Sequence, residues 1–301
     1  MQIMIIGAAG FIGKNLVTNL IKTDCHLNLV DKYLDSLKNM DLDSNKVSFF
    51  SDLKDVNEII KKQDYIYFLA CNTTPNSNSN MIDEFNLNLT PLVELLDSLN
   101  YNKTKFIFMS SGGTVYGNNN LDENCETSSK MPISFYGLQK SISETILDFY
   151  CRKFSLKYNI IRLSNPYGIY QNPQGNVGLI IKLIYQLMNN QPITIYGDGN
   201  NIRDYIYVSD AISMIVKIAN SNQNGAFNVG SGTGHSILEI VSTIEKILKI
   251  DAKKIFLENR SNDVRKSVLN IDKYINSFEK PQFTSLEKGI KSTYKFLLGE
   301  K

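Results

Sequence analysis

The amino-acid sequence predicts an α/β protein built on a doubly wound parallel sheet, with a smaller C-terminal α/β lobe. Short apolar runs, each the length of a buried strand, alternate with longer stretches whose apolar residues recur at helical spacing. This alternation continues from residue 2 to about Pro166, as expected for repeated strand–helix–strand units. Such a sheet binds its ligands beyond the carboxyl ends of its strands, so polar residues at those ends are site candidates.

The elements follow in order along the chain. Strands are expected at 2–6, 27–30, 47–50, 65–70, 106–109 and 159–163, and helices at 11–22, near 55–62, near 85–99 and over 136–152. A segment rich in Gly, Asn and Pro (165–178) precedes an amphipathic stretch at 179–189, strands at 226–229 and 254–257, and helices at 236–248 and 285–298. We expect a sheet domain over 1–168 with a return segment at 203–225, and a substrate lobe made of 169–202 and 226–301.

Composition narrows the classes of partner. The chain carries 32 basic and 30 acidic residues and no long block of like charge, which argues against nucleic acid or an anionic membrane as a partner. The four cysteines include no C-x-x-C pair, so we expect no metal site and no disulfide framework, and a cytoplasmic location. The apolar N-terminus has no basic residue before Lys14, unlike a signal peptide, and no run approaches the roughly 20 apolar residues of a membrane span.

The first strand runs into a glycine-rich loop, Gly7-Ala-Ala-Gly10-Phe-Ile-Gly13, that opens a helix. Glycines there allow a tight turn and close approach of the backbone to a pyrophosphate at the helix N-terminus. Asp31 ends the second strand, 18 residues past Gly13, where a carboxylate binds both ribose hydroxyls of NAD and repels the extra phosphate of NADP. These features predict a Rossmann-type, NAD-binding domain. The expected cofactor contacts are Gly7, Gly10, Phe11, Ile12, Gly13, Asp31, Asp52, Leu53, Leu69, Ala70, Ser110, Tyr136 and Lys140.

Asp52 and Leu53 follow the third strand, where an adenine ring would lie. A solvated turn aspartate fits that spacing equally well.

Tyr136 and Lys140 lie four residues apart at the start of a helical segment, so they share a face. A nearby ammonium favours the phenolate and lowers a tyrosine pKa, which would let Tyr136 exchange a proton with a sugar hydroxyl, an effect of roughly 10²–10⁴ in rate. Tyr101 and Lys105 repeat the spacing before a strand, where it indicates only a solvated turn. Only Tyr136 follows a polar strand end, in FIFMSSGGTVYG (106–117).

Together these motifs resemble the extended short-chain dehydrogenase/reductases, and more narrowly their nucleotide-sugar epimerase and dehydratase branch. The resemblance rests on GxxGxxG, the aspartate after the second strand, Ser-Ser-x-x-x-Val-Tyr-Gly and Tyr-x-x-x-Lys, and it covers nearly the whole chain. Three further segments are similar to signatures of the branch: RLSNPYG (162–168), IYGDGNNIRDYIYVSD (195–210) and NRSNDVRKSVLNIDK (259–273). The resemblance implies that Asn165, Arg203, Arg260 and Asp263 contact the sugar nucleotide.

The implied reaction is transient oxidation. In the family, the residue matching Tyr136 removes a proton from the C4 hydroxyl while hydride passes to NAD, the keto sugar rotates, and the hydride returns to its other face. The resemblance also implies a homodimer formed through the helices near 85–99 and 136–152.

The chain departs from the family at Gly112, where a Ser or Thr usually shares the hydrogen bond to the reacting hydroxyl. Thr114 is the favoured replacement and Ser111 the second, although Ser111 could merely cap the strand end and Thr114 could simply pack. The dehydratases place an Asp-Glu pair where this chain has Gly113 and Thr114, so elimination of water lacks its acid and base. No dehydratase activity is therefore expected.

Three functions remain open on the sequence. The first is an NAD-dependent epimerase of a nucleotide hexose, of the UDP-glucose 4-epimerase type. The second is a reductase of a nucleotide 4-keto-6-deoxy sugar, which the missing hydroxyl at Gly112 favours and Asp31 disfavours, since many reductases prefer NADPH. The third is a dinucleotide-binding protein without catalytic activity.

Overall fold

The computed structural model describes residues 1–118, 121–258 and 264–300. The chain divides into two compact units, which are described one at a time. The first unit comprises Met1–Ser111, Phe135–Arg162 and Ile215–Phe227, and the second comprises Gly112–Ser134, Leu163–Met214 and Asn228–Lys301.

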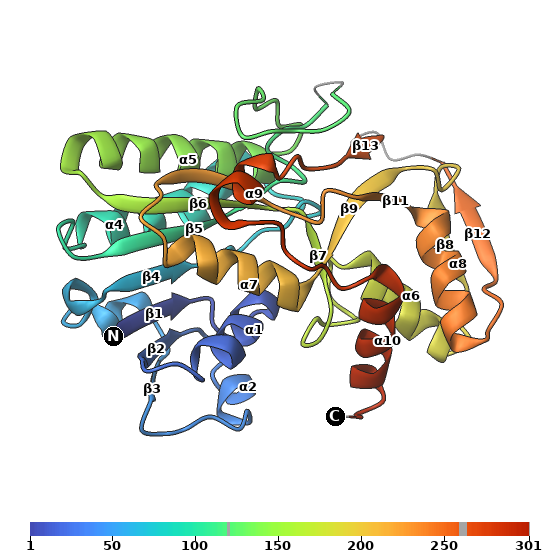
Figure 1. Ribbon diagram of the computed structural model, residues 1–301, viewed down its shortest axis with the longest axis horizontal. Helices are drawn as coiled ribbons and strands as arrows, with labels where there is room; N and C mark the ends of the chain where they lie inside the picture. The colour runs from blue at the N-terminus through green and yellow to red at the C-terminus, as the bar shows by residue number, and fades with distance from the viewer. Residues whose placement is uncertain (119–120, 259–263, 301) are drawn as a thin grey trace. The chain divides into compact units, whose positions relative to one another are not determined.

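Helices and strands alternate through the first half of the chain (Figure 1). In order they are β1 (Gln2–Ile6), α1 (Phe11–Leu20), β2 (His26–Val30), α2 (Asp35–Lys38), β3 (Val47–Phe50), the 3₁₀ turns η1 (Leu53–Val56) and η2 (Ile60–Lys62), β4 (Tyr65–Phe68), α3 (Met81–Glu84), the π-helix η3 (Phe85–Leu89), α4 (Thr90–Asp97), β5 (Lys105–Ser111), α5 (Phe135–Phe154) and β6 (Lys157–Leu163).

The second half mixes shorter elements. They are β7 (Asn165–Tyr167), α6 (Leu179–Met188), β8 (Ile193–Tyr196), β9 (Ile202–Tyr207), α7 (Val208–Ala219), β10 (Gly225–Val229), β11 (Gly234–Ser236), α8 (Ile237–Leu248), β12 (Lys254–Leu257), β13 (Lys266–Ser267), α9 (Asp272–Phe278) and α10 (Leu286–Leu297).

A seven-stranded parallel sheet organises the first unit. Its strand order is β3-β2-β1-β4-β5-β6-β10, and β1 pairs in parallel with β2 on one side and β4 on the other. The chain therefore reverses its direction of winding between β1 and β4, which is the switch point at which doubly wound sheets bind ligands. This arrangement confirms the predicted Rossmann-type fold.

One face of the sheet packs against α4 and α5, which lie beside each other in Figure 1. Alternate residues of each strand point to this face, because the side-chain period of a strand is two. Burying a large apolar side chain stabilises the fold by roughly 1.5–3 kcal/mol, so this layer contributes much of the stability of the unit. Its buried members include Met4, Ile6, Ile66, Phe68, Phe106, Phe108, Leu92, Leu95, Leu96 and Leu147.

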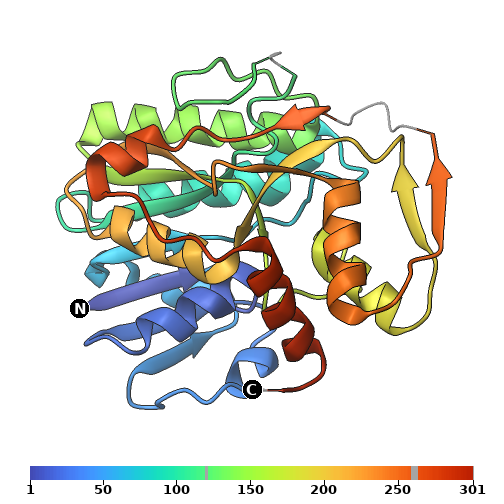
Figure 2. The same cartoon turned by 45° about the vertical axis from the view of Figure 1, so that its right-hand side comes forward.

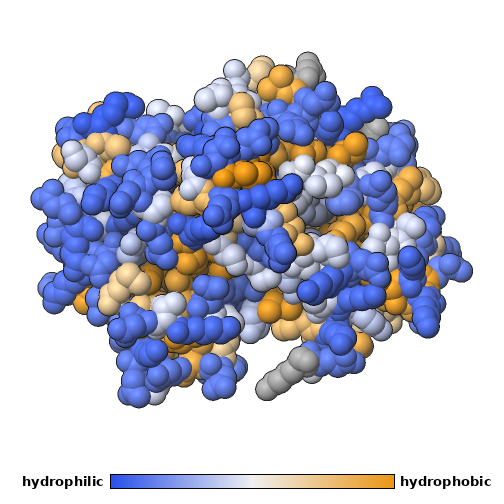
Figure 3. Space-filling model, viewed as in Figure 1, coloured by the Kyte–Doolittle hydropathy of each residue, from blue (hydrophilic) through white to orange (hydrophobic). Residues whose placement is uncertain are grey.

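The second unit has its own core and smaller sheets. β9 lies between β11 and β13 and also pairs with β7, while β8 and β12 form a separate two-stranded sheet that Figure 2 shows clearly. α6, α8 and α10 pack against one another and bury the apolar residues of the unit. In Figure 3, hydrophilic residues cover much of the face in view.

The structure differs from the sequence expectation in three places. The stretch near 55–62 forms two 3₁₀ turns, η1 and η2, instead of a helix. The helix expected near 85–99 is split into α3, the π-helix η3 and α4. β5 continues through Ser111, so its last two residues are the serines that follow the apolar run.

Candidate active site

The glycine-rich loop connects β1 to α1 within the first unit. Gly7 has φ +88, and a Cβ built on it would lie 2.7 Å from the backbone nitrogen of Ala70, so the end of β4 passes close to the loop. A Cβ on Gly13 would lie 2.3 Å from the carbonyl oxygen of Gly7, which no side chain can accommodate. The predicted contacts Leu69 and Ala70 both donate from their backbone nitrogens to the carbonyl of Ile6. The loop thus brings the ends of β1 and β4 together.

Asp31 lies directly after β2, and its carboxylate is held by two backbone donors. The nitrogen of Ala9, in the glycine-rich loop, donates to Oδ2 at 2.9 Å, and the nitrogen of Tyr33 donates to Oδ1 at 2.9 Å. These bonds fix the orientation of the carboxylate beside the loop. Hydroxyl groups of a ribose are the donors that such a carboxylate prefers.

Asp52 and Leu53 lie where β3 ends. The side chain of Asp52 accepts from the nitrogen of Lys54 and caps η1, and Asp55 returns the bond to the nitrogen of Asp52. This capping box accounts for Asp52 without a ligand, which agrees with the alternative that the sequence left open.

The residues of the loop fit a dinucleotide. The N-cap of α1 is Gly10, and no side chain caps the helix, so its first N–H groups remain available to a pyrophosphate. Gly7 and Gly13 allow the backbone of the loop to pack closely on itself and on the end of β4, and Phe11 and Ile12 form the first turn of the helix. Asp31 places a carboxylate beside the loop, a group with the chemistry to accept hydrogen bonds from a ribose.

Tyr136, Ser111 and Lys140 meet at the carboxyl end of β5. The hydroxyl of Ser111 hydrogen-bonds with that of Tyr136, the second residue of α5. The Lys140 ammonium donates to the carbonyl of Met109 at 2.9 Å and lies 5.7 Å from the centre of the Tyr136 ring. Lys140 is only 3% exposed. The structure thus brings a phenol, a hydroxyl and a buried ammonium together on adjoining elements.

The pKa of Tyr136 is raised in this structure, opposite to the effect expected from Lys140. Desolvation by burial is the largest cause, followed by the electrostatic effect of Cys71, and Glu84 adds a smaller rise. The hydrogen bond from Ser111 acts in the other direction. The phenol is therefore neutral in the protein alone, and its activation requires a positive charge or a further hydrogen bond.

A buried ion pair joins Glu144, one turn beyond Lys140 in α5, to Arg162 of β6. Arg162 of β6 donates to both oxygens of Glu144, at 2.8 and 3.1 Å, and the two side chains are about 6% and 1% exposed. Ser110, predicted to contact the cofactor, donates its hydroxyl to Glu144 at 2.6 Å. This pair was not predicted from the sequence. Its only signal was the spacing of four residues from Lys140 to Glu144, which repeats the spacing from Tyr136 to Lys140.

The second unit carries the predicted substrate residues. Asn165 begins β7 and donates from Nδ2 to the carbonyl of Asp204 at 2.9 Å, and a Cβ on Gly113 would lie 3.8 Å from its Oδ1. Arg203 lies in β9 next to the fully buried Asp204. The hydroxyl of Thr114 is buried and has no hydrogen-bond partner among the described residues. Arg260 and Asp263 lie outside the described residues.

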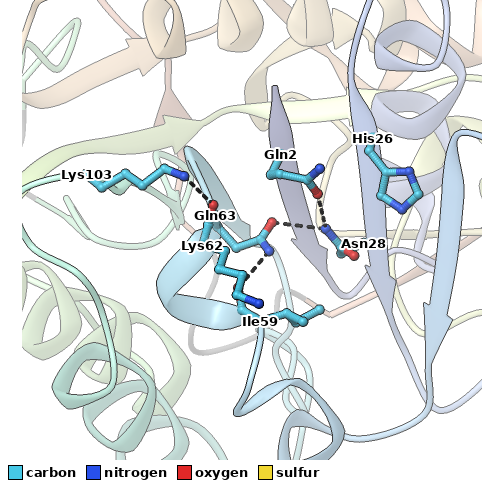
Figure 4. Close-up of a pocket in the computed structure, with 7 residues that line it drawn as sticks. All are labelled: Gln2, His26, Asn28, Ile59, Lys62, Gln63 and Lys103. Carbon is cyan, nitrogen blue, oxygen red and sulfur yellow. Dashed lines mark hydrogen bonds between the residues drawn. The ribbon is translucent and has the colours of Figure 1, made fainter.

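Two hollows in the structure do not coincide with these residues. The first, of about 480 Å³, lies at the amino end of the parallel sheet, where Asn28 donates from Nδ2 to the side-chain oxygens of both Gln2 and Gln63 (Figure 4). Because these amides are hydrogen-bonded within the protein, we interpret the first hollow as a polar region at the amino end of the sheet and not as a ligand site. The second, of about 730 Å³, lies in the second unit and is lined by Ile202, Arg265 and their neighbours.

Within residues 1–118, 121–258 and 264–300, no group of three or more His, Cys, Asp or Glu side chains could hold a metal ion. No helix in those same ranges is both long and apolar enough to cross a membrane. All four cysteines are free thiols.

Comparison with known proteins places the chain in a family. Residues 3–230 match the model of the NAD dependent epimerase/dehydratase family, so the chain belongs to that family and NAD is its cofactor.

Two relatives and one solved structure are among the most similar proteins. A protein of Methanocaldococcus jannaschii, whose name marks it as a proposed UDP-glucose 4-epimerase, is 31% identical over 96% of both chains. A dTDP-4-dehydro-6-deoxyglucose reductase of Escherichia coli is 33% identical over 81% of this chain and 80% of its own. The UDP-glucose 4-epimerase of Thermotoga maritima, solved with UDP-glucose, is 28% identical with a TM-score of 0.90, covering 99% of both chains.

Proposed function

We propose that this protein is an NAD-dependent 4-epimerase of a UDP-activated hexose. The observation that carries the proposal is the pairing of Tyr136 with Ser111, beside the buried Lys140, where β5 ends. The Thermotoga maritima 4-epimerase, similar over nearly the whole chain, supports the choice of substrate class.

In this mechanism the chain's own residues move one proton and hold two ligands. Bound NAD would supply the hydride acceptor at C4 and return the hydride after the sugar turns. Tyr136 takes the proton of the C4 hydroxyl, and Ser111 donates the hydrogen bond that stabilises the phenolate. Lys140 binds the cofactor ribose and adds positive charge near the ring.

The substrate residues follow from charge and geometry. Arg203 offers a guanidinium fork suited to the two phosphates of a sugar nucleotide, and Asn165 offers an amide beside Gly113. Arg260 and Asp263 keep their predicted roles near the nucleotide. Without an acidic pair after Gly112, the protein should not form a 4-keto-6-deoxy product from a nucleotide hexose.

A panel of UDP-, dTDP-, GDP- and CDP-sugars, with and without NADH, tests the function. We expect conversion of one UDP-hexose into its C4 epimer with no net change in nicotinamide absorbance. Tyr136→Phe should lower the rate by roughly 10²–10⁴-fold. Tyr101→Phe is the matched control, because Tyr101 precedes Lys105 at the same spacing but stacks on Phe154, at 4.7 Å between ring centres. Equal activity of the wild type and Tyr136→Phe would refute the proposal.

The hydroxyl that replaces the one missing at Gly112 can be identified with two variants. The sequence favours Thr114, and the hydrogen bond between Ser111 and Tyr136 supports Ser111. Ser111→Ala should therefore lower kcat by about tenfold or more, the loss of one hydrogen bond to a charged group. If Thr114→Val is the more damaging change, Thr114 has the role instead.

A reductase of a nucleotide 4-keto-6-deoxy sugar is the second candidate. The Escherichia coli relative is such a reductase, and Gly112 removes a hydroxyl that an epimerase would use. The stoichiometry separates the two: a reductase oxidises one NADH per turnover, and an epimerase consumes none.

The proposal includes a homodimer in a reducing compartment, the cytoplasm. Exposed apolar residues gather on α3, η3 and α5 in the first unit, where a second copy could cover them. The free cysteines fit the compartment. Light scattering on the wild type and on Phe149→Asp tests the dimer. The exposed residues are Ile82, Phe85, Leu87, Leu138 and Phe149.

A further inference from the structure

Asp204 of β9 is completely buried in the second unit, and both oxygens of its side chain accept hydrogen bonds. Oδ1 accepts from the backbone nitrogen and from the hydroxyl of Ser231, at 2.9 and 2.7 Å. Oδ2 accepts from the backbone nitrogens of Gly232 and Leu269, at 3.2 and 3.4 Å. The side chain therefore joins β9 to two segments that are distant in the sequence, the loop after β10 and the residues after β13.

The space around this side chain is closed. A Cβ built on Gly230 would lie 2.3 Å from Oδ2 of Asp204 and 3.2 Å from the Cβ of Ser164. A side chain at position 230 would therefore push against the carboxyl group or move its own backbone. The glycine is what allows the carboxyl group and its donors to lie together.

The backbone of Asp204 also binds a predicted substrate residue. Asn165 of β7 donates from Nδ2 to the carbonyl oxygen of Asp204 at 2.9 Å, and it is paired with Tyr205 where β7 lies beside β9. An amide nitrogen carries two protons, and this bond uses one of them. The position of the Asp204 carbonyl therefore sets the direction in which Asn165 presents its amide.

Arg203, the other predicted substrate residue of this unit, directly precedes Asp204 in β9. Successive side chains of a strand point to opposite faces, so the guanidinium leaves β9 on the face away from the buried carboxyl group. Its Nη1 donates to the carbonyl of Ile202 at 2.9 Å. The four hydrogen bonds to Asp204 thus hold, from the buried side, the stretch of backbone that carries Arg203 and orients Asn165.

We propose that Asp204 is a positioning residue for the sugar nucleotide: by anchoring β9 to the loop after β10 and to the segment after β13, it sets the positions of Asn165 and Arg203. The inference rests on the proposed function for the roles of Asn165 and Arg203 as substrate contacts. Because Asp204 is completely buried, it acts through these two residues and not by contact with the substrate. Its loss should therefore weaken binding of the nucleotide.

Asp204→Asn tests the proposal, because it keeps the shape of the side chain but replaces one acceptor oxygen by an NH₂ group. Such a group cannot accept from the backbone N–H groups that face both oxygens. In calorimetry, the variant should bind UDP about tenfold more weakly than the wild type. The KM for the UDP-hexose should rise by a similar factor with little change in kcat, as expected when ground-state binding is lost. The affinity for NAD should not change, because its predicted contacts lie in the first unit.

Asp210→Asn is the matched control. Asp210 belongs to the same unit, and its carboxylate likewise holds a segment distant in the sequence, accepting from the nitrogen and the hydroxyl of Thr284 at 2.7 and 3.0 Å. These bonds involve neither Asn165 nor Arg203. The control variant should therefore keep the affinity for UDP even where it lowers the stability of the unit.

The outcomes separate the possible errors. Unchanged UDP binding in Asp204→Asn, or equal weakening in Asp210→Asn, overturns the inference. If Asp204→Asn does not fold, Ser231→Ala removes the shortest of the four bonds and should weaken UDP binding about threefold; unchanged binding there overturns the inference.

Hydrogen exchange in the free protein separates this inference from the proposed function, because it needs no ligand. Backbone amides over 163–167 and 202–207 should exchange faster in Asp204→Asn than in the wild type, and Asp210→Asn should leave them unchanged. That result supports the anchoring of Asn165 and Arg203 even if the wild type binds no UDP, which would refute only the proposed function. Equal exchange in all three proteins overturns the inference.

Discussion

The buried pair of Glu144 and Arg162 offers a sharp test of how this fold is stabilised. Replacing Glu144 by glutamine keeps the shape of the side chain and removes its charge. The Arg162 guanidinium, about 6% exposed, would then be buried without a counter-charge. Ser110, which donates to Glu144 at 2.6 Å, can still donate to the amide oxygen, so the change isolates the ionic contribution.

The magnitude follows from distance and burial. Two unit charges 2.8 Å apart attract by about 6 kcal/mol at an effective dielectric constant near 20, and desolvation of both groups offsets much of that gain. Removing one partner leaves the desolvation cost of the other, so Glu144→Gln should lower the free energy of unfolding by about 3–5 kcal/mol. Arg162→Met should lower the free energy of unfolding by a similar amount. The loss in the double variant should be smaller than the sum of the two single losses by about 2 kcal/mol or more.

Urea unfolding followed by far-ultraviolet circular dichroism is the suitable assay, because the chain has no tryptophan. Glu287→Gln is the control: Glu287 and Lys291 form an exposed ion pair at 2.7 Å, and its loss should leave the unfolding midpoint unchanged. A cost below about 1 kcal/mol for Glu144→Gln, or additivity in the double variant, would refute the reasoning.

Three further predictions concern the cofactor loop and pH. Gly13→Ala should abolish NAD binding, because its Cβ would lie 2.3 Å from a backbone oxygen, whereas Gly10→Ala, at 3.3 Å, should be milder; equal affinities in calorimetry would contradict this. Asp31→Asn should weaken NAD binding about 10–100-fold, by about 1.5–3 kcal/mol, and should reduce the preference for NAD over NADP. An unchanged ratio of the affinities for NAD and NADP would argue against a contact between Asp31 and the ribose. Burial, together with the charge of Lys157, lowers the pKa of Lys105 to about 8. As the pH rises, the folded protein therefore loses this proton at a lower pH than the unfolded chain does. Stability should therefore rise with pH between about 8 and 10.5, and from pH 7.5 to 9.5 the wild type should gain about 2 kcal/mol relative to Lys105→Met. If the difference in stability between the wild type and Lys105→Met does not change with pH, the three backbone carbonyls to which Lys105 donates keep the ammonium charged in the folded protein.

The cofactor half of the site could be predicted because its signals are local. The glycine loop and Asp31 occupy positions fixed by a strand end and a helix start. The structure places the loop beside Ala70, and Asp31 accepts a hydrogen bond from Ala9 of the loop. Their chemical roles remain predictions.

The direction in which the pKa of Tyr136 is shifted could not be predicted from the sequence. Spacing indicated that Lys140 lies near the phenol, but the direction of the pKa shift depends on burial and on Glu84 and Cys71, which lie about 50 and 65 residues away in the chain. Long-range packing likewise determined that Ser110 bonds to Glu144.

The sequence by itself determined the fold class, the order of the strands through the first half of the chain, and the family, because periodicity and motifs are properties of neighbouring residues. The tertiary structure alone decided which hydroxyl meets Tyr136 and where buried charges are paired. The closeness of Ser111 to Tyr136 follows from the extension of β5 through Ser111 and from the packing of α5 against β5. The hydrogen bonds that Thr73 and Asn88 donate to the buried Glu84 likewise depend on the segment after β4 and the π-helix closing around it.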